Sequence, residues 1–300
     1  MSEQSTLNIP KSELASVAHV VAILLRDGDS ESSRTLVSQL QTDTDLGIGL
    51  SLDSAGEHSP FSGIERDVYL RHSAYVHRDR RASLDDELAT SVLSFGVKEY
   101  SLPRDHLAQE LFILATMMAG DRFSEAITFA EDYIAKWIVP VAAVVQRESH
   151  VADRMAIDVC LSLLDALLDQ SEKLSEDHKP VDSEELATID WTDLIKWLPY
   201  PDLTGMFVSR SQLSTLARKA NVPVGFGSRS QMVELLIDGA VRYNSQQVLR
   251  QGLLEILDTE LTTFRMIEQR LPEANCVVDW IGRLENTYRL VELLPGSSKE

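Results

Sequence analysis

Asp105 and His106 are neighbours in the segment SLPRDHLAQELFILA, residues 101–115, where they follow a proline and precede a strongly apolar stretch. An acid that orients an imidazole is an arrangement used in general base catalysis. Adjacent side chains on a helix point about 100° apart, however, so they do not face each other. His106 and Glu110 share a helix face and would make half of a metal site, but no second His or Cys lies at ligand spacing. The spacing therefore disfavours both catalysis and metal binding.

A helix cap is a simpler explanation for part of this pattern. Proline is favoured at the first position of a helix, and Pro103 would then place Asp105 in the first turn. A carboxylate there is stabilised by the helix dipole and by free backbone amides. This interpretation leaves His106 without a role, so a surface that binds another molecule remains the alternative.

A second candidate site is a group of four basic residues in a stretch that contains no acid. These residues, the basic patch, are Arg210, Arg218, Lys219 and Arg229. The two short helices expected here, joined by NVPVGFG, resemble the SAP helix–loop–helix module that contacts DNA. Arginines at helix N-termini could equally hold a phosphate of a nucleotide or cofactor. The interpretation that we rank first is that the patch docks on the acidic core domain.

The composition is that of a globular protein with a strongly acidic surface. The chain has 47 Asp and Glu against 28 Lys and Arg, a formal net charge of −19. Such a charge disfavours binding to nucleic acid. It favours either the binding of cationic partners or a highly soluble surface. No apolar run approaches the roughly 18–20 residues that span a bilayer, and the N-terminus lacks a secretory signal, so we expect a cytoplasmic protein. Cys160 and Cys276 predict neither a disulfide framework nor a metal cluster.

Helices must position these residues, because apolar side chains recur at helical spacing almost everywhere. The predicted helices of the first half include one that ends at Gly28, one from Ser59–Pro60 to about Arg78, one from Ser83 to near Gly96, and one from Pro103 to Gly120. Pro140 is expected to kink or divide the helix that contains it. No alternating run predicts a strand, and the fold is expected to be all-α.

The chain is expected to divide in an acidic stretch. Residues 165–190 hold nine acids against two lysines, a local net charge of −7, which predicts a fraying helix end and a linker. We therefore expect a helical core at 1–178 and a helical C-terminal extension at 179–300, with a helix–loop–helix at 209–243. Ser209 with Gln212, and Ser228 with Gln231, have the spacing of capping boxes that open its two helices. Two longer helices are predicted at 245–271 and 273–294.

Two segments between residues 97 and 168 carry a wider pattern, LPRDHLAQELFILATMMAG and FAEDYIAKWIVPVAAVVQRES. They resemble the TorD/DmsD/NarJ family of molybdoenzyme-specific chaperones, the nitrate reductase delta-subunit family. In that family a Pro-x-Asp-His segment precedes a helix that begins with Leu and carries Glu–Leu, and the next helix ends in Trp shortly before a proline. The matching positions are Pro103, Asp105, His106, Leu107, Glu110, Leu111, Trp137 and Pro140. Tyr69 with Arg71 is similar to the family's Tyr-x-Arg stretch.

The resemblance implies a helical bundle of the TorD-like type and a function in enzyme assembly without turnover. Its partners would be the cofactor-free catalytic subunit of a molybdopterin oxidoreductase and the twin-arginine signal peptide of that subunit. It implies no permanently bound cofactor and leaves open a transient contact with molybdopterin guanine dinucleotide or a guanine nucleotide. Either a monomer or a domain-swapped dimer is compatible with it.

The same resemblance implies a client-binding surface at Asp105, His106 and Glu110. A signal with paired arginines and an apolar segment needs an apolar groove with acids at one end. Asp105 and Glu110 could supply that charge, and His106 could orient a ligand. Leu107, Leu111 and Trp137 would either wall the groove or fill the core. Nucleic-acid or nucleotide binding through the basic patch at 209–229 remains the alternative function.

Overall fold

The computed structural model describes residues 10–27, 30, 35, 70–76, 80–97, 102–148, 151–170, 190–272 and 274–296. Across these ranges helices are the regular elements, apart from one isolated antiparallel bridge between Arg71 and His106. The all-α prediction is thereby confirmed. None of the described helices is long and apolar enough to cross a membrane.

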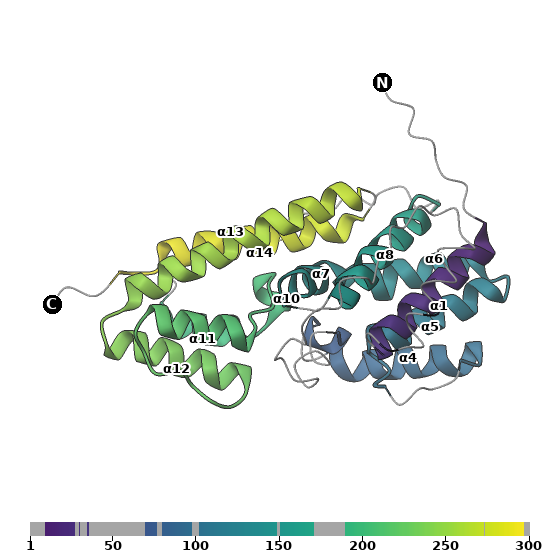
Figure 1. The fold of residues 1–300 in the computed structure, drawn as a ribbon. Helices are drawn as coiled ribbons and strands as arrows, with labels where there is room; N and C mark the ends of the chain where they lie inside the picture. Colours follow the sequence, from purple (N-terminus) through teal and green to yellow (C-terminus); the bar gives the residue numbers. More distant parts are fainter. Residues whose placement is uncertain are drawn as a thin grey trace, which may run out of the picture.

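The helices form two groups, and α7 of the first packs against α13 and α14 of the second (Figure 1). The first group, the core lobe, contains α1 (Lys11–Asp27), α4 (Arg81–Phe95), α5 (Leu107–Ala119), α6 (Phe123–Phe129), α7 (Lys136–Glu148) and α8 (Val151–Leu168). The second group, the extension lobe, contains α9 (Trp191–Trp197), α10 (Pro201–Thr204), α11 (Arg210–Lys219), α12 (Arg229–Arg242), α13 (Gln246–Arg270) and α14 (Asn275–Leu293). The acidic stretch chosen as the domain boundary lies mostly outside the described residues.

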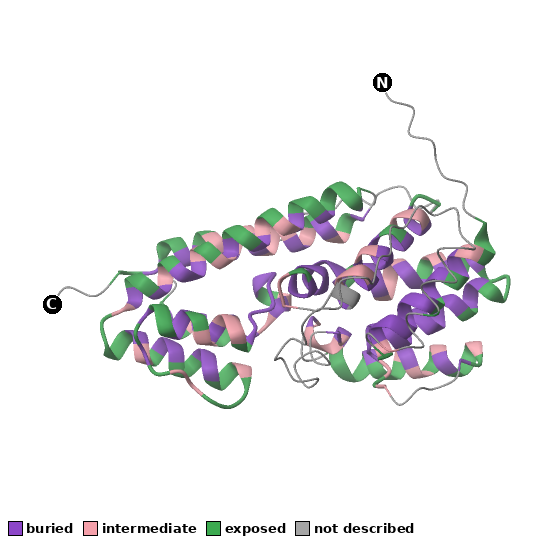
Figure 2. Ribbon diagram, in the orientation of Figure 1, coloured by how far each residue is buried: buried purple, intermediate pink, exposed green. Residues whose placement is uncertain are grey.

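The core lobe is built around α5, which packs against α1 and α4. Nearly every residue of α5 is buried, including Leu107, Leu111 and Glu110. A helix that is apolar all round belongs in the interior of a protein. The stripe predicted for the first helix is buried along α1, from Leu14 to Leu25. In contrast, α13 has exposed residues along its outer side and buried ones toward α14 (Figure 2).

Two helix predictions near the Asp–His pair are wrong where the chain is described; residues 59–69 of the first lie outside the described residues. Of the helix expected from residue 59 to about 78, residues 70–76 are described and form a turn with a single 3₁₀ segment, His72–Ala74. The backbone here pairs with a distant segment: the His72 amide donates to the Asp105 carbonyl at 2.7 Å, and the Leu107 amide donates to the Leu70 carbonyl at 2.9 Å. Helix α5 consequently begins at Leu107, and Asp105 precedes it instead of lying in its first turn.

Pro140 does not divide its helix, because α7 continues through it to Glu148. Proline has no amide proton, so it leaves the carbonyl of residue 136 without its usual donor. The Trp280 indole Nε1–H of α14 donates to that carbonyl at 2.7 Å. The Cys276 thiol donates to the neighbouring Ala135 carbonyl at 3.0 Å, at the end of a π-helical stretch. The extension lobe therefore satisfies the backbone carbonyl that Pro140 leaves open in the core lobe.

Both predicted capping boxes are confirmed. In α11 the Ser209 hydroxyl accepts from the Gln212 amide, and the Gln212 side chain accepts from the Ser209 amide. Ser228 and Gln231 make the same two bonds at the start of α12. The two boxes differ in their surroundings, since Ser228 is exposed whereas Ser209 is buried and its hydroxyl also donates to Glu148 of α7 at 2.5 Å.

Substituting these two serines should therefore have unequal effects. Ser228→Ala removes only a cap and is expected to lower the free energy of unfolding by about 1 kcal/mol. Ser209→Ala also removes a buried hydrogen bond to a carboxylate, so we expect a loss of about 2–3 kcal/mol. Urea unfolding of the two variants measures the difference, and equal losses would contradict a role for the Ser209–Glu148 bond.

Candidate functional site

The Asp–His pair lies where the 70–76 turn meets the start of α5. The Asp105 carboxylate accepts two hydrogen bonds from Arg71 through Oδ1, from Nε at 3.0 Å and from Nη2 at 2.9 Å. Its Oδ2 accepts from the Ser73 amide at 3.2 Å. Only 6% of the Asp105 side chain is exposed, against 42% for Arg71. Asp105 thus fixes the 70–76 turn against the start of α5 by its ion pair with Arg71 and by the hydrogen bond from the His72 amide to its carbonyl.

Two opposing effects act on the pKa of Asp105. Burial raises the pKa. The hydrogen bonds from Ser73 and Arg71, together with the charge of Arg71, lower it by more, so the pKa of Asp105 lies below its ordinary value. The carboxylate is therefore the form that the folded chain stabilises.

The acid dependence of stability follows from this shift. Because the pKa of Asp105 is lower in the folded chain than the usual 3.8, its contribution is present above pH 3.8 and is lost as the pH falls toward the folded value. We expect wild type to be more stable than Asp105→Asn near neutral pH, and the difference to shrink below about pH 4. Urea unfolding between pH 3 and pH 7 tests this expectation. A difference that stays constant over that range would contradict it.

His106 is the N-cap of α5, the role that the sequence left open. Its Nδ1 accepts from the Ala108 amide at 3.1 Å, and its side chain is almost completely buried. Histidine is not among the preferred N-cap residues, so the sequence contains no cap signal at His106 and predicts a helix that begins at Pro103.

Glu110 lies behind the cap in a fully buried polar group. Its Oε1 is hydrogen-bonded to His72 Nδ1 at 3.0 Å, and its Oε2 accepts from the Trp137 indole at 3.2 Å. Burial raises the pKa of Glu110, while the charge and hydrogen bond of His72 act against this rise. Burial, with a smaller contribution from the charge of Glu110, raises the pKa of the Cys160 thiol to about 12. A thiol with that pKa stays protonated and unreactive near neutral pH.

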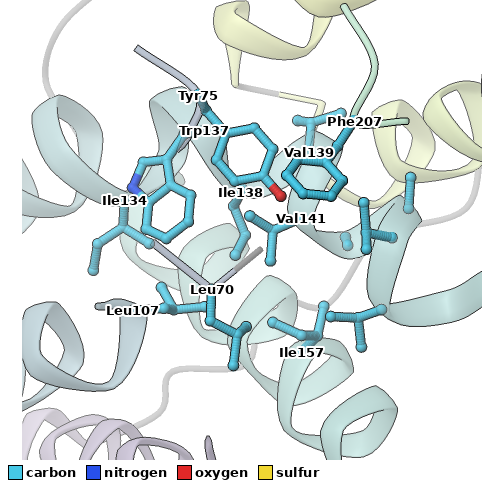
Figure 3. Close-up of a cluster of buried hydrophobic side chains, with 14 of the residues drawn as sticks. Leu70, Tyr75, Leu107, Ile134, Trp137, Ile138, Val139, Val141, Ile157 and Phe207 are labelled. Carbon is cyan, nitrogen blue, oxygen red and sulfur yellow. The ribbon is translucent and has the colours of Figure 1, made fainter. Parts of the chain in front are cut away.

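An aromatic group connects this polar group to the extension lobe (Figure 3). His72 stacks on Trp137 with ring centroids 5.0 Å apart, and Tyr75 lies 5.5 Å from Trp137. On its other side Tyr75 meets Phe207, at 5.7 Å, from the segment between α10 and α11. The ring of Phe207 belongs to the hydrophobic cluster of Figure 3 and brings the extension lobe into contact with Tyr75 of the 70–76 turn.

The six residues of the expected client-binding surface come together, but in the interior. Asp105, His106, Leu107, Glu110, Leu111 and Trp137 are each at most 5% exposed. Asp105, Glu110 and Trp137 contact the 70–76 turn, and Leu107, Leu111 and Trp137 fill the core. Sequence reasoning named Arg71 but missed His72 and Tyr75. His72 follows Arg71 directly and Tyr75 lies four residues after it, so a histidine and an aromatic residue close to Arg71 were the available signal.

A second polar cluster joins the two lobes around Arg147 at the end of α7. Arg147 Nε lies 3.0 Å from Glu148 Oε1, and its Nη1 is paired with Glu260 of α13. Its Nη2 donates to the Phe207 carbonyl at 3.2 Å. The two carboxylates and one guanidinium carry a formal charge of −1, and only 4% of the Glu260 side chain is exposed. Arg147 is therefore the central cation of the lobe interface, although sequence reasoning did not single it out.

The basic patch contacts its own lobe. Lys219 Nζ pairs with Glu255 of α13 at 2.7 Å. The Arg229 guanidinium lies 3.8 Å from the centroid of the Phe207 ring and donates to the Pro199 carbonyl at 2.8 Å. Arg218 bonds within α11, and Arg210 is exposed at its start. The sequence predicts docking of the patch on the core lobe. Lys219 and Arg229 instead bond to Glu255 and to the Pro199 carbonyl, which both belong to the extension lobe.

Among the described residues, no group of three His, Cys, Asp or Glu side chains is placed to hold a metal ion. Comparisons with known proteins found no matching family model, no matching curated protein and no matching solved structure.

Proposed function

We propose that this chain is a non-enzymatic cytoplasmic chaperone for the cofactor-free catalytic subunit of a molybdopterin oxidoreductase. Its client would be bound through the twin-arginine signal peptide, the mature subunit, or both, before cofactor insertion and export. A net charge of −19 suits a client whose signal carries paired arginines. The proposal rests on the resemblance of the core lobe to the TorD/DmsD/NarJ chaperones.

One structural observation carries the proposal. Besides the segments at 97–168, which include Pro-x-Asp-His around Asp105, the resemblance extends to a Tyr-x-Arg stretch around Arg71. Arg71 and Asp105 are 34 residues apart in the chain and form an ion pair at 2.9 Å. Two motif fragments that pair in space are expected if they belong to one structural unit, whereas unrelated coincidences in sequence have no reason to meet.

The burial of this unit changes the role we propose for it. Asp105, His106 and Glu110 are best suited to fix the turn at 70–76 against α5 and α7, which would hold the surrounding surface in one shape. Direct contact with the client would then fall to residues around the unit. Substituting Asp105 or His106 is accordingly expected to weaken client binding together with stability.

A titration with a synthetic signal peptide tests the proposal. The purified full chain is titrated in a calorimeter with a peptide that carries two consecutive arginines followed by an apolar segment. The control peptide has both arginines replaced by glutamine. We expect saturable binding to the first peptide and clearly weaker binding to the control, because the charge pairing is lost.

The same titration distinguishes the alternative function. A nucleic-acid or nucleotide binder acting through the basic patch would bind a DNA duplex or a guanine nucleotide with an affinity that falls steeply with salt. Binding of either ligand without binding of the signal peptide would overturn the chaperone proposal in favour of the alternative. The intramolecular pairing of Lys219 and the stacking of Arg229 on Phe207 argue against that alternative.

A further inference from the structure

Residues 205–209 form a non-helical segment that is buried between the two lobes. All five residues, Gly-Met-Phe-Val-Ser, are buried, with Met206 and Val208 each 1% exposed. The segment begins at Gly205, which has φ of 80° and whose Cβ, if present, would lie 2.7 Å from the Leu284 amide nitrogen of α14. Only glycine fits both that backbone conformation and that close approach. The close packing of Gly205 against α14 therefore fixes where residues 206–209 enter the space between the lobes.

The core lobe holds this segment by its backbone and by one aromatic side chain. Arg147 donates to the Phe207 carbonyl, and Glu148 accepts from the Ser209 hydroxyl. The Phe207 ring packs against Tyr75, which itself packs against Trp137. A backbone carbonyl held by a guanidinium, and a side chain held in an aromatic cluster, are features by which proteins bind peptides in a non-helical conformation.

We propose that the surface formed by Tyr75, Arg147 and Glu148 is a peptide-binding site, and that residues 205–209 are its internal occupant. The partner it fits is a peptide with an aromatic or large apolar residue near a guanidinium, the chemistry of a twin-arginine signal. The inference rests on the proposed function and extends it: the client binds by displacing Phe207 and Ser209 from this surface.

The charges around the segment support a cationic partner. Arg147, Glu148 and Glu260 together carry a formal charge of −1, and the guanidinium of Arg229 near Phe207 is the cation that balances it in the chain itself. The internal occupant already shows the expected combination, because the Arg229 guanidinium stacks on the face of Phe207. An arginine near an aromatic ring gains a cation–π interaction in addition to its charge pairing.

Competition by an internal segment has a measurable consequence. A client can bind only the fraction of molecules whose surface is free, so the occupant raises the apparent dissociation constant. Phe207→Ala removes the side chain that anchors the segment to Tyr75. We expect this variant to bind the twin-arginine peptide about tenfold more tightly than wild type, or better. Calorimetric titration of the full-length variant measures the change.

Leu236→Ala is the matched control. Leu236 is a buried side chain of α12, a helix that packs on α9, α11 and α13 of the same lobe. Its truncation also destabilises the extension but leaves the segment at 205–209 in place, so peptide affinity should equal that of wild type. Equal affinities for wild type and Phe207→Ala, or tighter binding by both variants alike, would overturn the internal-occupant inference and leave the chaperone proposal standing.

Hydrogen exchange in the wild-type chain provides a second test that needs no substitution. On addition of the peptide, the amides of residues 206–212 are expected to exchange faster, because the segment leaves its site. Peptide binding with unchanged or slower exchange there would contradict displacement. Absence of peptide binding by wild type and by Phe207→Ala would instead overturn the proposed function, and the inference with it.

Discussion

Replacing Arg147 with methionine is expected to lower the free energy of unfolding by about 3 kcal/mol. Arg147 is paired with both Glu148 and Glu260 and donates to the Phe207 carbonyl. Methionine fills similar space but leaves the carboxylates of Glu148 and Glu260 without their shared cation and with little solvent access. Breaking a buried ion pair costs about 3–5 kcal/mol, and we take the lower end because 22% of the Arg147 side chain is exposed.

Arg265→Met is the matched control for this substitution. Arg265 pairs with Glu285 at 3.2 Å between α13 and α14, but 61% of its side chain is exposed. An exposed pair of this kind contributes about 0–1 kcal/mol. Urea unfolding of both variants compares the two values. Equal losses would show that Arg147 is not the central cation of the lobe interface.

A second substitution separates the loss of Arg147 from the effect of the charge left behind. If the cost of Arg147→Met arises from uncompensated carboxylates, adding Glu260→Gln should restore part of the stability, because it removes one of the two charges. A double variant that is less stable than Arg147→Met alone would indicate that lost packing, and not charge, dominates.

Glu110→Ala is the second substitution with a large expected effect. It removes the hydrogen-bond partner of two buried groups, His72 Nδ1 and the Trp137 indole N–H, and opens a cavity in the core. Each buried polar group left without a partner costs about 1–3 kcal/mol. We therefore expect the free energy of unfolding to fall by about 3 kcal/mol or more. Thermal and urea unfolding measure this loss.

Glu110→Gln tests whether hydrogen bonding is the cause. Glutamine keeps the volume of Glu110 and retains one carbonyl oxygen, which can still accept from Trp137. Its loss of stability should accordingly be smaller than that of Glu110→Ala. Similar losses for the two variants would point to the charge of Glu110, and not to its acceptors, as the stabilising feature.

The sequence predicts local features of this fold well. The buried stripe of α1, the stop of α4 at Gly96 and both capping boxes depend on residues within a few positions of one another, and each is found in the structure. Such features follow from helix geometry and from the need to satisfy terminal amides. The all-α class follows from the same periodicity.

The candidate site could be predicted only in part, because its geometry depends on distant segments. An aspartate two residues after a proline is typical of the first turn of a helix. The carbonyl and carboxylate of Asp105 are instead hydrogen-bonded to residues 71–73. That pairing keeps Asp105 out of the helix and makes His106 the cap. Spacing along one helix could indicate that Glu110 faces inward, but not that His72 and Trp137 would meet it there.

The bond from Trp280 to the Lys136 carbonyl has a consequence for the order of folding. Its two partners are 144 residues apart, and those of the Cys276–Ala135 bond are 141 apart. Contacts of such long range form late, because the intervening chain must first be ordered. On the ribosome, α7 emerges long before α14, with the carbonyl at Lys136 still unpaired. We expect the core lobe to reach its final packing only after α14 has been synthesised.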